Sequence, residues 1–337
     1  MIQIRPMQAA DIPFGLALCR QAGWNHLEAD WRRLLALAPQ GVFVAEELGR
    51  PGPSPVRAPT GGTVLAGTAS ALAYGPQTAW IGMVLVHQDF RRRGIATALM
   101  TECIGVLQDR RVESIKLDAT QEGRQVYLKL GFLDERPVVR YACPGGLGLR
   151  GQLAALQMHP QVRTLRPADI AALAALDRTA FGADRTVLLA ALALDGEAVL
   201  LGEASAPRGY GFARAGYLAT YLGPIVARDP EAAQAVVETL LARLHLAATR
   251  HAGQRHVAPR PAAASTPPTR SPEDAADNVF WDVLADDAPA GLPTQAGRLA
   301  EALGFSVARR LTRMYLGEKM NPGEVGLIYG IAGFEFG

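Results

Sequence analysis

The feature that most constrains the fold of this chain is an internal repeat. The stretch IQIRPMQAADIPFGLAL near the start matches VRTLRPADIAALAAL further along, with Arg5 opposite Arg166. Near the end of each half, YLKLGF matches AEALGF, and the two stretches end at Phe132 and Phe305. Between these marks each half alternates strand-like and helix-like runs, which is typical of α/β folds. We therefore expect two α/β sandwich domains in tandem.

Segments rich in proline and glycine suggest where these domains end. The stretch CPGGLGLRGQ is typical of a linker, which we place at residues 143–161. The first domain is then predicted to span residues 1–142 and the second residues 162–337. A Pro-rich stretch without aromatic residues, residues 256–278, is interpreted as a mobile insertion. Residues 49–62 are predicted to form a long hairpin loop, and the apolar residues 326–337 a tail that packs on the body.

The charge balance argues against a nucleic-acid-binding protein. The chain has 34 Lys and Arg residues and 32 Asp and Glu residues, which gives a formal net charge of +2. A dedicated nucleic-acid-binding domain usually carries a larger and more clustered basic excess. The basic run that does occur, RRR at residues 91–93, is short and lacks interleaved aromatic residues.

Other features predict a cytoplasmic protein without a membrane span or a metal site. The cysteines are three in number and widely spaced, so they form neither a disulfide framework nor a zinc motif. The N-terminus lacks the apolar core of a signal peptide, and Asp195 and Glu197 interrupt the most apolar region. Three histidines have a spacing that fits no metal-binding helix: His245, His251 and His256.

A basic, glycine-containing turn is the main functional signal. WIGMVLV is a continuous apolar run and predicts a buried strand, whereas the residues from Gly94 onward show the apolar spacing of a helix. The run Arg91–Gly94 therefore lies at a helix N-terminus, where unpaired N–H groups and a partial positive charge favour anions. Glycine allows close approach of a phosphate, and arginines add charge-assisted contacts. From these residues alone, a solvated basic turn remains an alternative.

Two motifs together carry a family resemblance. RRRGIA resembles the Arg/Gln-x-x-Gly-x-Gly/Ala motif of GCN5-related N-acetyltransferases, the GNAT superfamily. DATQEGRQVYLKLGF, further along, is similar to the second signature of that superfamily. The resemblance covers residues 1–142 and, more loosely, residues 162–316. It implies two tandem GNAT-type domains with mixed sheets and splayed central strands.

The resemblance also implies a binding site for acetyl-CoA between the splayed strands, which are Trp80–Val86 and Ser114–Ala119. The pantetheine arm is expected on the backbone of the first strand, and the diphosphate on the following turn. Together these residues are Val84, Leu85, Val86, Arg91, Arg92, Arg93, Gly94, Ile95, Ala96 and Thr97. Tyr127 matches the family tyrosine that can protonate the departing thiolate.

The acceptor side is less well defined by the sequence. Many family members carry a glutamate on the splayed strand, but WIGMVLV has no carboxylate. Asp118 is a candidate base or amine ligand, although it could equally cap the following turn. Trp24, His26 and Asp30 lie where the family builds its acceptor wall. When the two copies are aligned, the diphosphate motif corresponds to Glu231, Gln234 and Val236, and Tyr127 corresponds to Ala300. The second copy is therefore expected not to bind coenzyme.

These observations predict an N-acetyltransferase that moves the acetyl group of acetyl-CoA to a primary amine of a small molecule or an amino terminus. The alternative is a non-catalytic acetyl-CoA-binding sensor or interaction protein with the same fold. The second domain is expected to shape the acceptor site. The protein is expected to be a monomer or a homodimer, and the sequence does not identify the acceptor.

Overall fold

The computed structural model describes the chain except for residues 49–62, 149–150, 204, 256–276, 286–292 and 320–322. The predicted mobile insertion therefore lies outside the described residues except at its end, and so does the predicted hairpin loop. The strands on either side of that loop pair antiparallel, starting with Leu48 opposite Thr63, as a hairpin requires.

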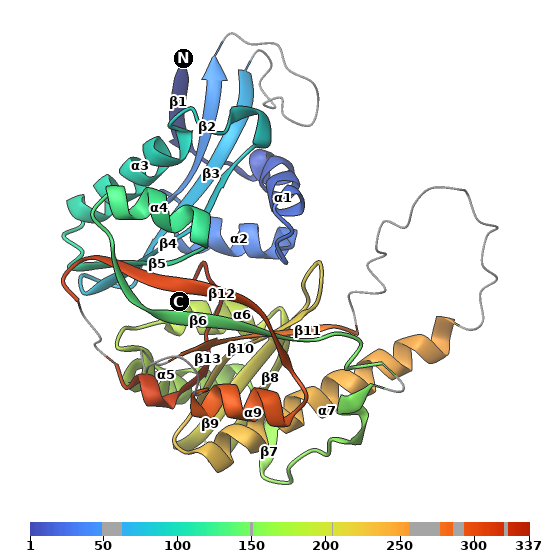
Figure 1. The fold of residues 1–337 in the computed structure, drawn as a ribbon. Helices are drawn as coiled ribbons and strands as arrows, with labels where there is room; N and C mark the ends of the chain where they lie inside the picture. The colour runs from blue at the N-terminus through green and yellow to red at the C-terminus, as the bar shows by residue number, and fades with distance from the viewer. Residues whose placement is uncertain (49–62, 149–150, 204, 256–276, 286–292, 320–322) are drawn as a thin grey trace, which may run out of the picture.

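Both halves of the chain repeat one order of elements (Figure 1). The first half contains β1 (Ile2–Pro6), α1 (Ile12–Gln21), α2 (Glu28–Leu37), β2 (Val42–Leu48), β3 (Thr63–Ala73), β4 (Thr78–Val86), α3 (Ile95–Asp109), β5 (Ser114–Ala119), α4 (Gln121–Lys129) and β6 (Leu133–Cys143). The second half contains β7 (Val162–Thr164), α5 (Ile170–Phe181), α6 (Thr186–Ala193), β8 (Gly196–Glu203), β9 (Ala206–Arg214), β10 (Thr220–Ala227), α7 (Pro230–Arg255), β11 (Val279–Leu284), α9 (Gln295–Ala302), β12 (Ser306–Gly317) and β13 (Ile328–Gly330). This is the tandem α/β architecture that the repeat predicts.

The structure corrects one detail of the repeat. The guanidinium of Arg5 binds the carboxylate of Asp11 at 2.7 Å, and Arg163 binds Asp169 at 2.7 Å in the same way. Arg163 is therefore the counterpart of Arg5. Arg166 instead donates its backbone N–H to Asp169. The two Arg-Pro dipeptides look alike in the sequence but lie at different positions of this shared turn.

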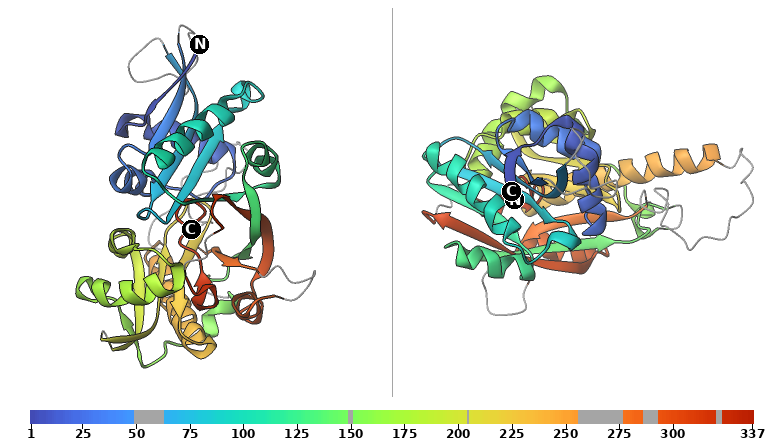
Figure 2. Two further views of the ribbon diagram at one scale, coloured as in Figure 1. Left: turned by 90° about the vertical axis from the view of Figure 1, so that its left-hand side faces the viewer. Right: turned by 90° about the horizontal axis from the view of Figure 1, so that it is seen from above.

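The two halves exchange their last strands. The strand order is β1-β2-β3-β4-β5-β12-β6-β11-β10-β9-β8-β7, so β12 of the second half lies between β5 and β6. β12 pairs antiparallel with β5, and β6 pairs antiparallel with β11. Figure 1 shows β6 and β12 crossing the middle of the molecule together, and Figure 2 shows the same pair from two other sides. The division at residue 142 stays a prediction, but each predicted domain completes its sheet with a strand of the other.

The hydrophobic cores follow the same exchange. Met314 of β12 is fully buried in a core cluster that contains side chains of β3, β4 and β5 and extends into the second half, for example to Tyr210 of β9. Val139 and Tyr141 of β6 are buried in the core of the second half, with Trp281 of β11. Each half therefore loses part of its apolar core if the other half is removed.

The parallel strands in the centre of each half diverge. β4 and β5 pair only as far as Trp80 opposite Lys116, and β10 and β11 only as far as Leu222 opposite Trp281. The splayed central strands expected for the fold are thus confirmed. In the second half, β13 fills the gap by pairing antiparallel with β10 at Ile225 and Val226. No described strand occupies the equivalent gap beside β4, where a cavity opens.

We predict that the two halves unfold as one cooperative unit, because each completes the core of the other. Met314→Ala should lower the free energy of unfolding by about 2–5 kcal/mol, the usual cost of truncating a buried methionine. Tryptophan fluorescence and far-UV circular dichroism should report the same single transition in urea. Met158→Ala is the control, since Met158 is 51% exposed. Two separate transitions, with only one of them shifted by Met314→Ala, would contradict the prediction.

Candidate active site

A cavity of about 810 Å³ opens where β4 and β5 diverge. It is lined by β4, the turn before α3, the N-terminal part of α4, and the loop between α1 and α2. The second half contributes to the same wall through Arg214, Tyr221, Arg309, Arg310 and Leu311, and the closing segment through Gly333, Phe334 and Glu335. Both halves therefore build one site.

The turn before α3 is open to an anion. Gly94 is the residue before the first turn of α3, and its φ of 76° is a left-handed conformation that favours glycine. Gly94 has no side chain to cap the helix, so the first amide groups of α3 lack a side-chain acceptor. No heavy atom lies within 4 Å of the position where a Cβ would project from Gly94. This geometry suits a phosphate group at the helix N-terminus.

The three arginines of the turn point to different partners. Arg91 and Arg92 line the cavity, and Nε of Arg91 donates to the carbonyl oxygen of Val86 at 3.3 Å. Arg93 instead forms an ion pair with Glu47 on β2, outside the cavity lining. The side chain of Arg93 thus already has a carboxylate partner, and its place in the coenzyme site stays a prediction. Of the remaining predicted coenzyme residues, Val84, Leu85, Val86 and Ala96 line the cavity, whereas Gly94, Ile95 and Thr97 do not.

Tyr127 projects from α4 into the cavity lining. Thr120 fixes the start of α4, because its hydroxyl accepts a hydrogen bond from the N–H of Gly123 at 3.1 Å. Burial raises the pKa of Tyr127, and the neighbouring Cys103 raises it further. The phenol is therefore protonated at neutral pH and can donate its proton or a hydrogen bond.

Asp118 is held by an arginine of the exchanged strand. Its carboxylate receives two hydrogen bonds from Arg313 of β12, at 2.8 and 3.0 Å, and its side chain is fully buried. Burial raises the pKa of Asp118, and the charge of Arg313 opposes this rise. Asp118 does not cap α4, a role that Thr120 performs instead. A carboxylate bound in this way is poorly placed to remove a proton from an amine.

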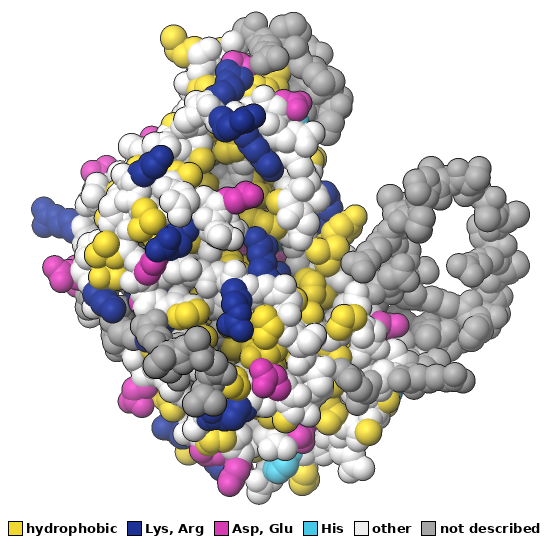
Figure 3. All heavy atoms as spheres, viewed as in Figure 1, with side chains coloured by type: hydrophobic (Ala, Val, Ile, Leu, Met, Phe, Trp, Pro, Cys, Tyr) yellow, Lys and Arg dark blue, Asp and Glu magenta, His cyan; other side chains and the backbone are white. Residues whose placement is uncertain are grey.

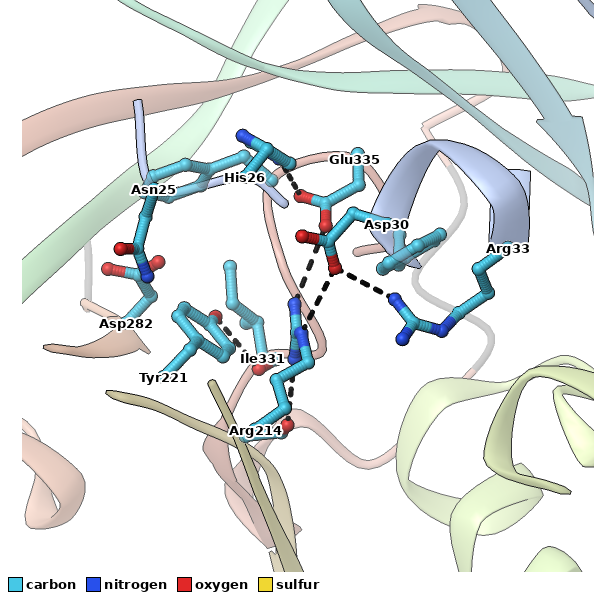
Figure 4. A network of polar contacts seen from close by, with 12 residues as sticks. Asn25, His26, Asp30, Arg33, Arg214, Tyr221, Asp282, Ile331 and Glu335 are labelled. Carbon is cyan, nitrogen blue, oxygen red and sulfur yellow. Dashed lines mark hydrogen bonds and ion pairs between the residues drawn. The ribbon is translucent and has the colours of Figure 1, made fainter. Parts of the chain in front are cut away.

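The three predicted acceptor residues all line the cavity, and two of them belong to a network that joins the halves (Figure 4). Nε2 of His26 lies 3.3 Å from a carboxylate oxygen of Glu335, and Arg214 lies 3.4 Å from the other oxygen. Asp30 accepts from the backbone N–H of Leu27 at 2.7 Å and pairs with Arg33 at 2.8 Å. Asp30 thus stabilises the start of α2 as well as the cavity wall.

Asn25 fixes the loop that carries His26. Its side-chain oxygen accepts from the backbone N–H of Leu218 and of Ala219, at 2.7 and 3.0 Å. Its amide nitrogen donates to the carbonyl oxygen of Ala219 at 2.9 Å. This buried side chain therefore ties the loop after α1 to the loop between β9 and β10.

Glu335 was missed by the sequence analysis. The closing segment is clasped by both halves: Tyr74 and Trp80 donate to the carbonyl oxygens of Phe336 and Phe334, and Tyr221 donates to that of Ile331. A Cβ at Gly82 would lie 2.8 Å from Cα of Glu335, so this close approach requires glycine in β4. The available signal was that Glu335 is the single charged residue in the apolar stretch GLIYGIAGFEFG.

Burial and the ion pair act in opposite directions on His26 and Glu335. Burial lowers the pKa of His26, but the carboxylate of Glu335 outweighs it and raises the pKa to about 10. Burial raises the pKa of Glu335, but His26 and Arg214 outweigh it and lower the pKa to about 2. Both groups are therefore charged at neutral pH.

The second half lacks an equivalent of this turn. Its helix α7 begins directly after β10, at Pro230, and the carboxylate of Asp229 accepts from the N–H of Ala232 at 2.8 Å. Glu231 and Gln234, which the repeat placed opposite the arginine turn, lie within the first turns of α7. An aspartate before proline starts a helix early, which explains the difference. The helix N-terminus that is open in the first half is thus capped in the second.

The described part of the chain contains neither a candidate membrane span nor a candidate metal cluster. No helix there is long and apolar enough to cross a membrane. Within the same residues, no group of three or more His, Cys, Asp or Glu side chains is arranged to hold a metal ion.

We predict that Glu335→Gln lowers the pKa of His26 well below its wild-type value, because burial is then no longer opposed by the carboxylate. The wild-type ring should titrate near 10. Protonated His26 stabilises the folded state, and this contribution is fully present below pH 6.5. It is lost as the pH rises toward 10 and the ring loses its proton. NMR titration of the ring protons measures both values. Glu122→Gln, which removes an exposed carboxylate of the same cavity, should leave His26 unchanged. A wild-type ring that titrates near 6.5 would contradict the prediction.

Comparison with known proteins agrees with this geometry. A family model described as the acetyltransferase (GNAT) family matches residues 19–132. A second model, described as an acetyltransferase (GNAT) domain, matches residues 173–250. The matches fall in the two halves in turn and include the turn before α3 and Tyr127.

The chain is also similar to individual proteins, one by sequence and others by fold. The chain is 28% identical over 229 residues to the "uncharacterized N-acetyltransferase YitH" of Bacillus subtilis, covering 67% of this chain and 73% of YitH. A "putative acetyltransferase" from Pyrococcus horikoshii superposes with a TM-score of 0.69 at 20% identity, covering 100% of this chain and 96% of that one. A "tandem GNAT protein from the clavulanic acid biosynthesis pathway" superposes with a TM-score of 0.55 at 16% identity. The match covers 94% of this chain and 98% of that one. The chain belongs to the GNAT family as a tandem, acetyl-CoA-dependent acyltransferase.

Proposed function

We propose that this protein transfers the acetyl group of acetyl-CoA to a primary amine of a small molecule or of an amino terminus. The observation that carries the proposal is one continuous cavity that joins an open helix N-terminus, a protonated tyrosine and a polar pocket between the halves. These parts correspond to the needs of coenzyme binding, leaving-group protonation and acceptor binding.

The coenzyme end of the cavity fits acetyl-CoA, which supplies an activated acetyl thioester. The uncapped first turn of α3 and the guanidinium groups of Arg91 and Arg92 suit the diphosphate. The edge of β4 that faces β5 has no described strand partner beyond Trp80. The backbone of Val84–Val86 can therefore pair with the pantetheine amides and can direct an N–H at the acetyl oxygen.

Only the first half is proposed to bind coenzyme. In the second half, β13 occupies the gap beside β10 where a pantetheine arm would otherwise pair. Asp229 caps α7 and adds a negative charge where a diphosphate would lie. Ala300, opposite Tyr127 in the repeat, is fully buried and carries no acid. The second half instead supplies acceptor-side residues such as Arg214 and Tyr221.

Tyr127 is proposed as the general acid. Its hydroxyl holds a proton at neutral pH and makes no hydrogen bond with any described residue, so it is available to protonate a departing thiolate. Asp118, Glu335 and Asp30 are each paired with an arginine. We propose that these carboxylates hold the residues of the cavity wall in place. The amine would then lose its proton to water.

We predict that Tyr127→Phe lowers kcat by about 10² or more, while KM for acetyl-CoA changes little, because the acid acts only in the transition state. Coenzyme release against a panel of amines measures this. Tyr141→Phe is a matched control, because Tyr141 contacts Glu301 in the second half, away from the cavity lining.

Wild-type turnover by Tyr127→Phe on a chemistry-limited substrate would show that Tyr127 is structural. Acetyl-CoA binding without release on any amine would favour a sensor over an enzyme.

A further inference from the structure

Arg309 is a cation on the cavity wall that has no counterion among the described residues. It lies on the exchanged strand β12, directly opposite Arg140 of β6 in the sheet, and both side chains line the cavity. Arg140 is fully engaged, since Asp282 accepts two hydrogen bonds from it at 2.8 and 2.7 Å. Arg309 is half-buried and forms no hydrogen bond or ion pair with any residue that the structure describes.

The local electrostatics favour an added anion. Burial lowers the pKa of Arg309, and the charge of Arg140 lowers it further against the weaker attraction of Asp282 and Glu122. Asp282 is bound directly by Arg140 and acts on Arg309 only from further away. A half-buried cation without a partner is costly, and a ligand anion removes that cost. Figure 3 shows Lys and Arg side chains following one another down the middle of this face.

This cationic position belongs to the acceptor side of the cavity. Arg140, which lies opposite Arg309 in the sheet, binds Asp282 of β11 in the second half. Phe334, beside Glu335 in the closing segment, stacks on Arg140 at 4.6 Å. Through Arg140 and Phe334, Arg309 is linked to the closing segment that carries Glu335, and we therefore assign it to the acceptor side of the cavity.

We propose that Arg309 binds an anionic group of the acceptor, so that the substrate is an amine that also carries a carboxylate or a phosphate. This inference rests on the proposed function. The planar guanidinium matches either group with two parallel hydrogen bonds, which gives orientation as well as affinity. Arg140, held by Asp282, stays behind Arg309 and adds positive potential. The acceptor would thus be anchored by its anion while its amine reaches toward Tyr127.

The test compares matched amines that differ in the anion. L-Phenylalanine is paired with phenethylamine, L-lysine with cadaverine, and O-phosphoethanolamine with ethanolamine, and kcat/KM is measured by coenzyme release. The two amino-acid pairs report a carboxylate and the third pair a phosphate. We expect at least one anionic member to exceed its partner by about tenfold or more, as a charge-assisted hydrogen bond implies.

Variants of Arg309 assign the preference to this residue. Arg309→Gln should abolish the preference by raising KM for the anionic amine, and Arg309→Lys should retain part of it. Arg110→Gln, which removes one exposed positive charge at the end of α3, should change neither. Equal kcat/KM within every pair would overturn the proposal. So would a preference that survives in Arg309→Gln, or an effect of that variant confined to KM for acetyl-CoA.

A binding measurement separates this inference from the proposed function. If no amine releases coenzyme, the proposed function fails, and the same pairs are titrated by calorimetry into protein saturated with CoA. Tighter binding of an anionic member that Arg309→Gln abolishes would still support the anion site. Equal or undetectable binding within every pair would overturn it.

Discussion

The antiparallel pairing of β12 with β5 is the interaction on which the rest of the structure depends. It inserts a strand of the second half beside the strand that carries Asp118, and the return strand β6 completes the sheet of the second half. Arg313 of β12 neutralises the buried Asp118, and Arg309 of the same strand reaches the cavity wall. Because backbone hydrogen bonds and both cores cross between the halves, the halves are fixed relative to each other. The cavity wall that they build together therefore depends on this pairing.

The closing segment turns two similar halves into one site. Its strand β13 fills the gap beside β10, and the residues after it cross to the first half and place Glu335 against Gly82. The same short segment thus closes one cleft and completes the wall of the other. The buried charges of His26, Glu335, Arg214 and Asp30 compensate one another, which makes the network tolerable at low dielectric. Such a network favours one arrangement of the halves over alternatives.

The sequence was most informative where function depends on local backbone geometry. The open helix N-terminus at Gly94 could be predicted because capping is a local property, whereas Tyr127 was identified through the resemblance of its motif to a family signature. The pairing of Arg93 with Glu47 and of Asp118 with Arg313 could not, since an ion-pair partner depends on which strands become neighbours. The strand exchange could not be predicted from the sequence for the same reason. Apolar periodicity shows which face of a strand is buried, but it does not show which strand pairs with it. Arg309 became visible only once that neighbour was known.

Calorimetric titration of acetyl-CoA into the full chain tests the central claim, which is that one coenzyme binds at the Gly94 turn of the first half. Gly94→Asn and Gly94→Asp provide a matched pair, because both side chains tolerate a left-handed backbone and differ mainly in charge. We expect a stoichiometry near one, binding by the Asn variant, and at least about tenfold weaker binding by the Asp variant, whose carboxylate repels a diphosphate. A stoichiometry near two, or equal affinities of the two variants, would contradict the account.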